Sequence, residues 1–218
     1  MRVLESSTFV TSSVVTMLAV VVMLIADVRA ANVVRGLSKT VAVFGFLAAA
    51  LSAGFPSHRA GAIMFVALVF CGLGDLLLIP GGASRTFLLG LGAFLLGHVG
   101  FLVAFVTEGV SWLASGLALP VLMPVVGLVL RWLLPHVKSS MKLPVLLYVA
   151  VITLMVAGSV GSVARGGSVL GLIAAVAFFF SDLAVARERF VKDTLINKLW
   201  GAPLYFGAQL VFAAWILR

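Results

Sequence analysis

Long apolar runs alternate with short polar breaks along all 218 residues of the chain. Most runs approach the length of about 20 residues that an α-helix needs to cross the hydrocarbon core of a bilayer. Because the breaks are too short to hold a soluble domain, the pattern predicts an all-α polytopic transmembrane helical bundle, with residues 1–218 forming a single domain. The second run is short, and a start several residues earlier is an open alternative. The eight expected spans cover residues 9–26, 40–54, 60–79, 87–106, 112–134, 143–160, 168–186 and 200–217.

The composition supports a lipid environment. Hydrophobic residues make up 63% of the chain and charged residues only 10%. A soluble domain carries charge on about a quarter of its residues, so this chain has too little charge to cover a surface that faces water. Helices that satisfy their backbone hydrogen bonds internally can face hydrocarbon without such charge.

The cationic residues divide unequally between the two sides of the expected bundle. With eight spans, eleven of the 15 Lys and Arg residues fall on one side and four on the other. Cytoplasmic loops carry an excess of Lys and Arg, so we expect the larger set in the cytoplasm and both termini outside. This bias favours a plasma membrane, or the inner membrane if the protein is bacterial. The larger set is Arg29, Arg35, Lys39, Arg85, Arg131, Lys138, Lys142, Arg187, Arg189, Lys192 and Lys198; the smaller is Arg2, Arg59, Arg165 and Arg218.

The net charge of +8 has the same explanation, since cationic loops face anionic headgroups. Membrane lipids are therefore expected as partners, and nucleic acid is not, because no basic segment is long enough to form a binding surface. The segment Val28-Arg29-Ala30 resembles a signal-peptide cleavage site. Cleavage there would leave a cationic cluster at an exported N-terminus, against the charge bias, so the first run is kept as a span.

Two acidic residues lie inside apolar runs. Asp75 and Asp182 fall about equally far into the third and seventh spans, which run in the same direction. A carboxylate at membrane depth is costly and is expected to face a cavity or a partner. Two carboxyls in one low-dielectric site cannot both ionise readily, so one is expected to stay protonated while the other becomes the anion. Such a pair supplies an acid and a base; the alternative is that each Asp only bonds a neighbouring helix.

The candidate partners of these carboxyls are few. Lys39 lies at the start of the second span. Two interpretations of it are open: it binds a phosphate, or it anchors the helix by extending its ammonium group to the membrane interface. The other candidates are uncharged polar side chains. They either orient water or substrate, or form hydrogen bonds between helices. One His with two Asp is an incomplete ligand set for a metal, so we expect no metal and no cofactor. The candidates are Lys39, His98, Tyr148, Tyr205 and Gln209.

A spacing of 107 residues recurs in the chain. It separates Asp75 from Asp182, and also His98 from Tyr205. Two four-span halves of the same orientation would produce this spacing, although the flanking sequences differ. Small residues are expected to let the third and fourth spans approach closely; they are Gly72, Gly74, Gly90, Gly92 and Gly97.

A set of short strings lies around the candidate residues: GLGDLLL around Asp75, Phe87 with Gly90, FLLGH ending at His98, Pro144-Val145 with Tyr148 and Met155, FFFSDLAVA around Asp182, and Tyr205 with Gln209. Taken together, these strings resemble the YhhN family of lysoplasmalogenase-like membrane proteins. The resemblance covers about residues 35 to 215, and it is the combination that is specific rather than any single motif. Two positions depart from the family pattern: Phe101 replaces an aromatic hydroxyl, and Thr40 replaces a proline.

The resemblance implies a hydrolase that cleaves the vinyl ether bond of lysoplasmalogens, a class of lysophospholipid, to a fatty aldehyde and glycerophosphoethanolamine or glycerophosphocholine. Asp75 and Asp182 would be its catalytic pair. Lys39 would hold the phosphate, and His98, Tyr148, Tyr205 and Gln209 would position water or headgroup. A proton-coupled transporter or lipid flippase that uses the same carboxyls is the alternative, followed by a non-catalytic scaffold. The sequence leaves open whether the protein forms a homodimer.

Overall fold

The computed structural model describes residues 7–54, 58–79 and 85–216, and within these ranges it consists of helices joined by short turns and loops. The all-α prediction is confirmed. Eight α-helices follow one another, with a 3₁₀ turn at Leu134–His136 after the fifth and a π-helical turn at Arg187–Val191 after the seventh. The α-helices are α1 (Ser7–Val28), α2 (Asn32–Ser52), α3 (Arg59–Leu78), α4 (Arg85–Glu108), α5 (Trp112–Leu133), α6 (Ser139–Ala164), α7 (Val169–Ala186) and α8 (Leu195–Trp215).

Seven helices of the described ranges, α1 to α7, are long and apolar enough to cross a bilayer. The protein is therefore a multi-pass membrane protein. The eighth helix has a spanning length of 21 residues, but Asn197, Lys198 and Gln209 lower its hydropathy. These polar side chains need not meet lipid, because α8 packs on α1, α2, α3 and α7, and Asn197 and Gln209 are buried. Eight crossings with both termini outside stay a prediction.

Three helices begin four or more residues earlier than their apolar runs predict. α2 begins at Asn32 instead of 40, which confirms the alternative of an earlier start, while α6 begins at Ser139 instead of 143 and α8 at Leu195 instead of 200. The polar residues that were expected to form loops instead continue the helix. Lys39 therefore lies two turns inside α2 and does not open it. Residue 217, the expected end of the last span, lies outside the described ranges, as do Arg2 and Arg218.

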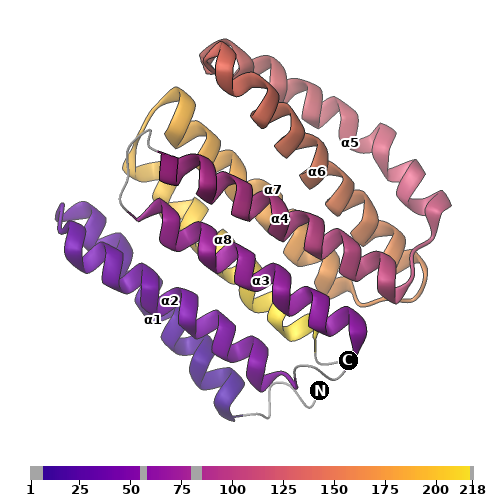
Figure 1. Ribbon diagram of the computed structural model, residues 1–218, viewed down its shortest axis with the longest axis horizontal. Coiled ribbons are helices and arrows are strands. Elements are labelled where there is room, and N and C mark those ends of the chain that lie inside the picture. Colours follow the sequence, from indigo (N-terminus) through magenta and orange to yellow (C-terminus); the bar gives the residue numbers. More distant parts are fainter. Residues whose placement is uncertain (1–6, 55–57, 80–84, 217–218) are drawn as a thin grey trace.

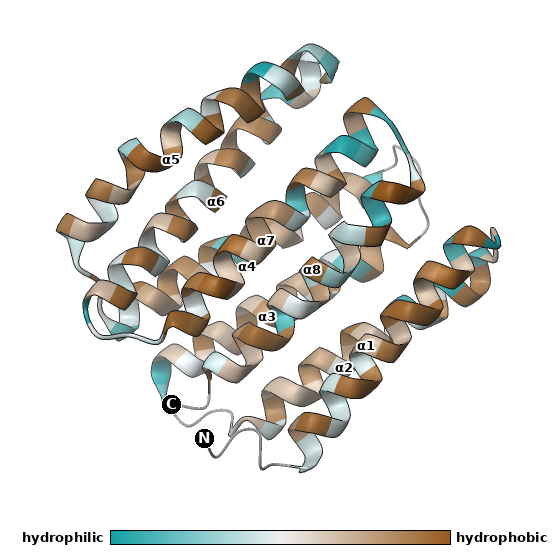
Figure 2. Cartoon of the chain, turned by 180° about the vertical axis from the view of Figure 1, so that it is seen from behind, coloured by the Kyte–Doolittle hydropathy of each residue, from teal (hydrophilic) through white to brown (hydrophobic). Residues whose placement is uncertain are grey.

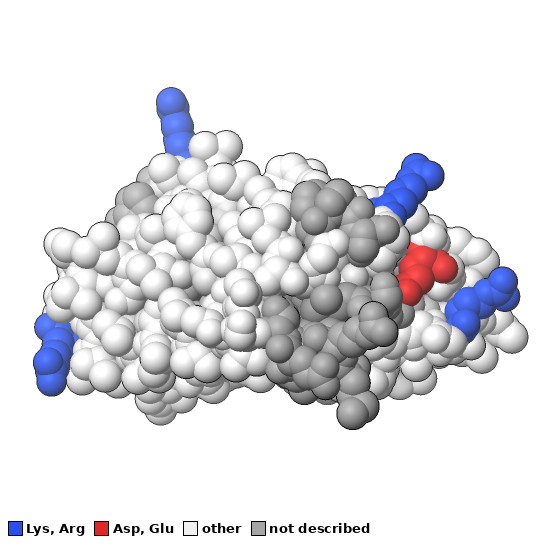
Figure 3. All heavy atoms as spheres, turned by 90° about the horizontal axis from the view of Figure 1, so that it is seen from below, with Lys and Arg blue, Asp and Glu red and all other residues white. Residues whose placement is uncertain are grey.

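The helices run side by side along one common direction, with α1 and α2 at one flank and α5 and α6 at the other (Figure 1). α5 is the most peripheral helix: it packs almost entirely on α6, and large apolar side chains such as Leu117, Val121 and Leu128 are exposed on it. Hydrophobic residues line the length of the bundle, and hydrophilic ones gather toward the helix ends (Figure 2). On the face seen in Figure 3, the middle shows no charged side chains among the described residues.

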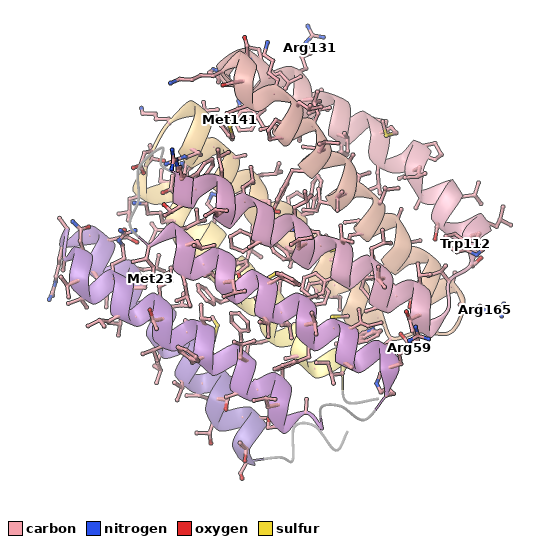
Figure 4. The ribbon with its side chains drawn as sticks, viewed as in Figure 1. Met23, Arg59, Trp112, Arg131, Met141 and Arg165 are labelled. Carbon is pink, nitrogen blue, oxygen red and sulfur yellow. The ribbon has the colours of Figure 1, made fainter. Side chains whose placement is uncertain are left out.

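Cationic side chains mark the two ends of the bundle. Arg131 lies at one end, and Arg59 and Arg165 lie at the other (Figure 4). The sequence likewise assigns Arg131 to one side of the membrane and Arg59 and Arg165 to the other. Which end faces the cytoplasm stays a prediction from the bias in Lys and Arg.

The interface between α3 and α4 depends on glycine. A Cβ added at Gly97 would lie 2.6 Å from the Cys71 Sγ atom, and one at Gly90 would lie 3.0 Å from Leu78. Gly74 belongs to the same interface, because its Cβ would meet the Phe94 ring. The expectation was wrong for the other two glycines: Gly72 faces α2, and Gly92 faces open space.

Candidate active site

A cavity of about 230 Å³ lies among the eight helices, and its lining includes side chains from each of them. Asp75 and Asp182 both face it, so the two intramembrane carboxyls share one chamber. Five of the seven residues singled out in the sequence line it: Lys39, Asp75, Tyr148, Asp182 and Tyr205.

Asp75 is the more buried carboxyl, with a residue exposure of 3%. The Nζ atom of Lys39, from α2, lies 2.9 Å from its Oδ1 atom. The hydroxyl of Tyr205, from α8, donates to its Oδ2 atom at 2.5 Å. Both oxygens therefore accept from donors, one of them a cation, which is the arrangement of an ionised carboxylate.

Asp182 has a different environment. The hydroxyl of Tyr148 donates to its Oδ2 atom at 2.9 Å, and the Nε2 atom of His98 lies 3.4 Å from the same oxygen. The Oδ1 atom has no hydrogen-bond partner among the described residues, and the side chain is 17% exposed against 4% for Asp75. Asp182 therefore has one oxygen with partners and one that is available to carry a proton.

His98 lies behind Asp182 and does not line the cavity. Its Nδ1 atom lies 2.7 Å from the Phe94 carbonyl oxygen, which can only accept, so Nδ1 carries a hydrogen. Its Nε2 atom lies 3.4 Å from the Asp182 Oδ2 atom and has no hydrogen-bond partner among the described residues. His98 therefore adjoins Asp182 through a polar contact, and it reaches the cavity only through Asp182.

The two carboxyls are held by equivalent helices of the two halves of the chain. Within each half, the second helix supplies one partner of the Asp on the third helix: Lys39 for Asp75, and Tyr148 for Asp182. The other partner comes from the fourth helix of the opposite half: Tyr205 for Asp75. His98 of α4 does the same for Asp182. The 107-residue spacing therefore corresponds to an exchange of partners between halves.

Gln209 does not line the cavity either. It is fully buried one turn beyond Tyr205 on α8, and its amide oxygen and nitrogen have no hydrogen-bond partner in the described part of the chain. Phe101, which replaces the family's hydroxyl, stacks on Phe212 with ring centroids 4.0 Å apart. A purely aromatic contact therefore fills the place where the family often has a hydroxyl.

Charged residues at one end of the cavity were missed by the sequence interpretation, which assigned them to loops. Asp27 of α1, Arg35 of α2 and Lys198 of α8 all line it. The Asp27 Oδ1 atom lies 3.9 Å from Arg35 Nε and 3.3 Å from Lys198 Nζ. One signal was available, because Arg35 precedes Lys39 by four residues and must share its helix face.

The described residues hold no group of three or more His, Cys, Asp or Glu side chains placed to bind a metal ion. The polar groups at or beside the cavity are carboxyl, ammonium, imidazole and phenol groups.

The fold and site define a class: a multi-pass α-helical membrane protein with two unlike carboxyls inside the bundle. A model of the YhhN family matches residues 34–216, and the chain belongs to this family. The chain is also similar to the proteins named Lysoplasmalogenase of Mycobacterium bovis and Mycobacterium tuberculosis. Each is 29% identical over 174 residues, which is 77% of this chain and 65% of the relative. The match thus covers just under two thirds of the relatives' length. No solved structure matches the chain.

Proposed function

We propose that the protein is a lysoplasmalogenase-like hydrolase that cleaves the vinyl ether bond of a lysoplasmalogen inside the membrane. The products are a fatty aldehyde and a glycerophospho-base. Membership of the YhhN family and the similarity to two proteins named Lysoplasmalogenase support this reaction class. The observation that carries the proposal is the unlike pair of carboxyls in one cavity, Asp75 held by a cation and Asp182 with an oxygen available for a proton.

The walls of the cavity supply an orientation for a single-chain lipid. Asp27, Arg35 and Lys198 line the cavity from α1, α2 and α8, which pack on one another. α5 and α6 lie at the opposite flank of the bundle (Figure 1) and line the cavity with aliphatic side chains and Tyr148, the partner of Asp182. A polar headgroup fits the first wall and an apolar chain fits the second. The aliphatic wall consists of Val126, Val129 and Leu133 of α5 and Val145, Val149 and Ile152 of α6.

This orientation divides the roles of the carboxyls. In a vinyl ether the carbon that accepts a proton lies on the chain side of the bond, and the oxygen lies on the headgroup side. Asp182, beside the aliphatic wall, is the acid that protonates this carbon. Asp75, beside the polar wall, is the carboxylate that stabilises the oxocarbenium ion and then takes a proton from the attacking water.

The proton count closes over one turnover. Asp182 gives a proton to carbon and becomes a carboxylate, while water adds to the oxocarbenium carbon and loses a proton to Asp75, forming a hemiacetal. The hemiacetal then collapses: its hydroxyl proton returns to Asp182, and Asp75 protonates the departing glycerol oxygen. One vinyl ether and one water become one aldehyde and one alcohol, and both carboxyls return to their starting states.

The remaining residues support these two groups. Lys39 keeps Asp75 ionised through the 2.9 Å contact; that it holds the phosphate stays a prediction. Tyr205 and Tyr148 fix the directions of the two carboxyls, and His98 supplies a polar contact to Asp182 at 3.4 Å. A role for Gln209 in binding substrate stays a prediction.

Purified protein tests the proposal with three single-chain lipids of equal length: a 1-alkenyl, a 1-alkyl and a 1-acyl glycerophosphoethanolamine. We expect aldehyde from the alkenyl lipid, and no reaction with the alkyl ether, which cannot form the oxocarbenium ion by protonation at carbon. Release of fatty acid from the acyl lipid without aldehyde from the alkenyl lipid would contradict the proposal.

A proton-coupled transporter or flippase is the second candidate. The exchange of partners between two halves of the chain favours it, because internal repeats are typical of transporters. It requires lipid or solute flux in proteoliposomes that follows an imposed pH gradient, with no aldehyde formed. The same preparation therefore separates the two candidates.

A further inference from the structure

The charged residues that line the end of the cavity form a group of both signs. We call Asp27, Arg35, Glu188 and Lys198 the rim; all four line the same cavity as Asp75 and Asp182. They come from α1, α2, the π-helical turn after α7, and α8. π-helical turns are uncommon and occur frequently at functional sites.

The rim carries its charges in a partly shielded position. The Asp27 side chain is only 11% exposed, and those of Arg35 and Lys198 are 30% and 24% exposed. Lys198 lies 3.8 Å from Glu188 in addition to its contact with Asp27. Charged groups held this way beside an apolar chamber interact with a ligand more strongly than groups in open water.

Lys39 was the expected phosphate ligand, but in this structure its ammonium contacts Asp75. The next cation on the same face of α2 is Arg35, four residues earlier and about 6 Å along the helix axis. That displacement is comparable to the length of a glycerol backbone between a phosphate and the oxygen at the opposite end. A lipid whose ether oxygen lies at Asp75 would therefore place its phosphate near Arg35.

We propose that the rim is a headgroup site for a zwitterionic single-chain phospholipid, with Arg35 binding the phosphate and the Asp27 carboxylate binding the headgroup ammonium. This inference rests on the proposed function for the placement of the ether, and it assigns the residues that hold the headgroup, which the proposed function does not name. A guanidinium suits a phosphate because it donates in a fork. A carboxylate beside it suits a quaternary or primary ammonium. The same carboxylate repels the phosphate of a ligand that carries no ammonium group.

The purely structural account is that the rim only ties α1, α2 and α8 together. Both accounts predict that loss of Arg35 or Asp27 lowers thermal stability. The two accounts differ in what they predict for ligand binding. If the rim only ties helices together, a variant has a smaller folded fraction, which lowers the apparent affinity for every ligand equally. The ratio of affinities for two ligands, measured on the same variant, then stays unchanged.

The test uses radiolabelled 1-alkyl lipids, which are not cleaved, binding to the protein in nanodiscs. The three ligands carry phosphocholine, phosphate alone, or no headgroup. Arg35→Gln is expected to weaken both phosphate-containing ligands about tenfold relative to the alkylglycerol, and Asp27→Asn to weaken the phosphocholine lipid about tenfold relative to the alkyl phosphate. Arg131→Gln on the exposed side of α5 and Glu108→Gln at the end of α4 are the matched controls, since neither residue lines the cavity.

An unchanged ratio in either rim variant overturns the headgroup site. Because the assay measures binding, it is independent of turnover. Selective binding without any aldehyde from alkenyl lipid would leave the headgroup site in place and contradict the proposed reaction. Aldehyde formation with unaltered ratios of affinities would leave the proposed reaction in place and contradict the headgroup site.

Discussion

The Tyr205 hydroxyl donates a 2.5 Å hydrogen bond to Asp75, across 130 residues of sequence and from the last helix of the chain to its third. His98, which lies 107 residues before Tyr205, stands in the same relation to Asp182, which lies 107 residues after Asp75. Each half of the chain thus completes the environment of the other half's carboxyl. The sites are equivalent in position but differ in chemistry, since Asp75 meets a phenol and an ammonium while Asp182 meets a phenol and an imidazole.

Asp182→Asn is expected to lower the rate of aldehyde release by at least about 100-fold, the contribution typical of a general acid. The amide cannot protonate carbon, but it has the same shape and still accepts from Tyr148. Initial rates with alkenyl lysophospholipid measure the effect, and thermal unfolding verifies the fold. Glu108→Gln is the control for loss of a carboxylate outside the cavity. An Asp182→Asn rate within a few-fold of the unaltered protein would disprove the assigned role.

Lys39→Met is expected to destabilise the protein by about 3–5 kcal/mol, because it leaves the Asp75 carboxylate buried without its cation. Adding Asp75→Asn to Lys39→Met removes the uncompensated charge, so the double variant should regain most of the lost stability and none of the activity. Thermal unfolding of the two single variants and the double variant measures this coupling. Additive losses of stability would show that the two groups do not form an ion pair.

His98→Phe is expected to lower kcat about tenfold, because it removes the polar imidazole that lies 3.4 Å from the Asp182 carboxyl, and to leave KM nearly unchanged. The reason is that the imidazole contacts Asp182 and does not line the cavity. His98→Gln carries an amide N–H at a position similar to Nε2 and should recover part of kcat. A rise in KM with constant kcat would instead place His98 in contact with substrate.

Gly97→Ala is expected to destabilise the bundle by about 1–3 kcal/mol through overpacking, because its Cβ would lie 2.6 Å from the Cys71 Sγ atom and 3.3 Å from a backbone oxygen of α3. Gly92→Ala lies on the same helix in open space, and is expected to be neutral or to stabilise, since Ala favours helix over Gly. Thermal unfolding of both variants provides the comparison. Equal effects would contradict the close approach of α3 and α4.

The fold was predictable because hydrocarbon allows few alternatives to apolar helices. Asp75 and Asp182 could be found for the same reason, as carboxyls inside apolar runs are costly. The helix starts were wrong where polar residues face the interior: Arg35, Lys39 and Lys198 look like loop residues, but they pair with acids inside the bundle. Which phenol meets which Asp depends on the rotation of helices that are 34 residues apart for Tyr148 and Asp182 and 130 apart for Tyr205 and Asp75, and spacing along the chain does not determine that.

The central claim is that Asp182 transfers a proton to carbon, and hydrolysis in D₂O tests it most directly. The aldehyde is trapped as it forms, and its mass is measured. We predict one deuterium on the carbon next to the carbonyl in the aldehyde from the unaltered protein, and no aldehyde above background from Asp182→Asn. Aldehyde without deuterium at that carbon, or with the same yield from Asp182→Asn, would contradict the mechanism.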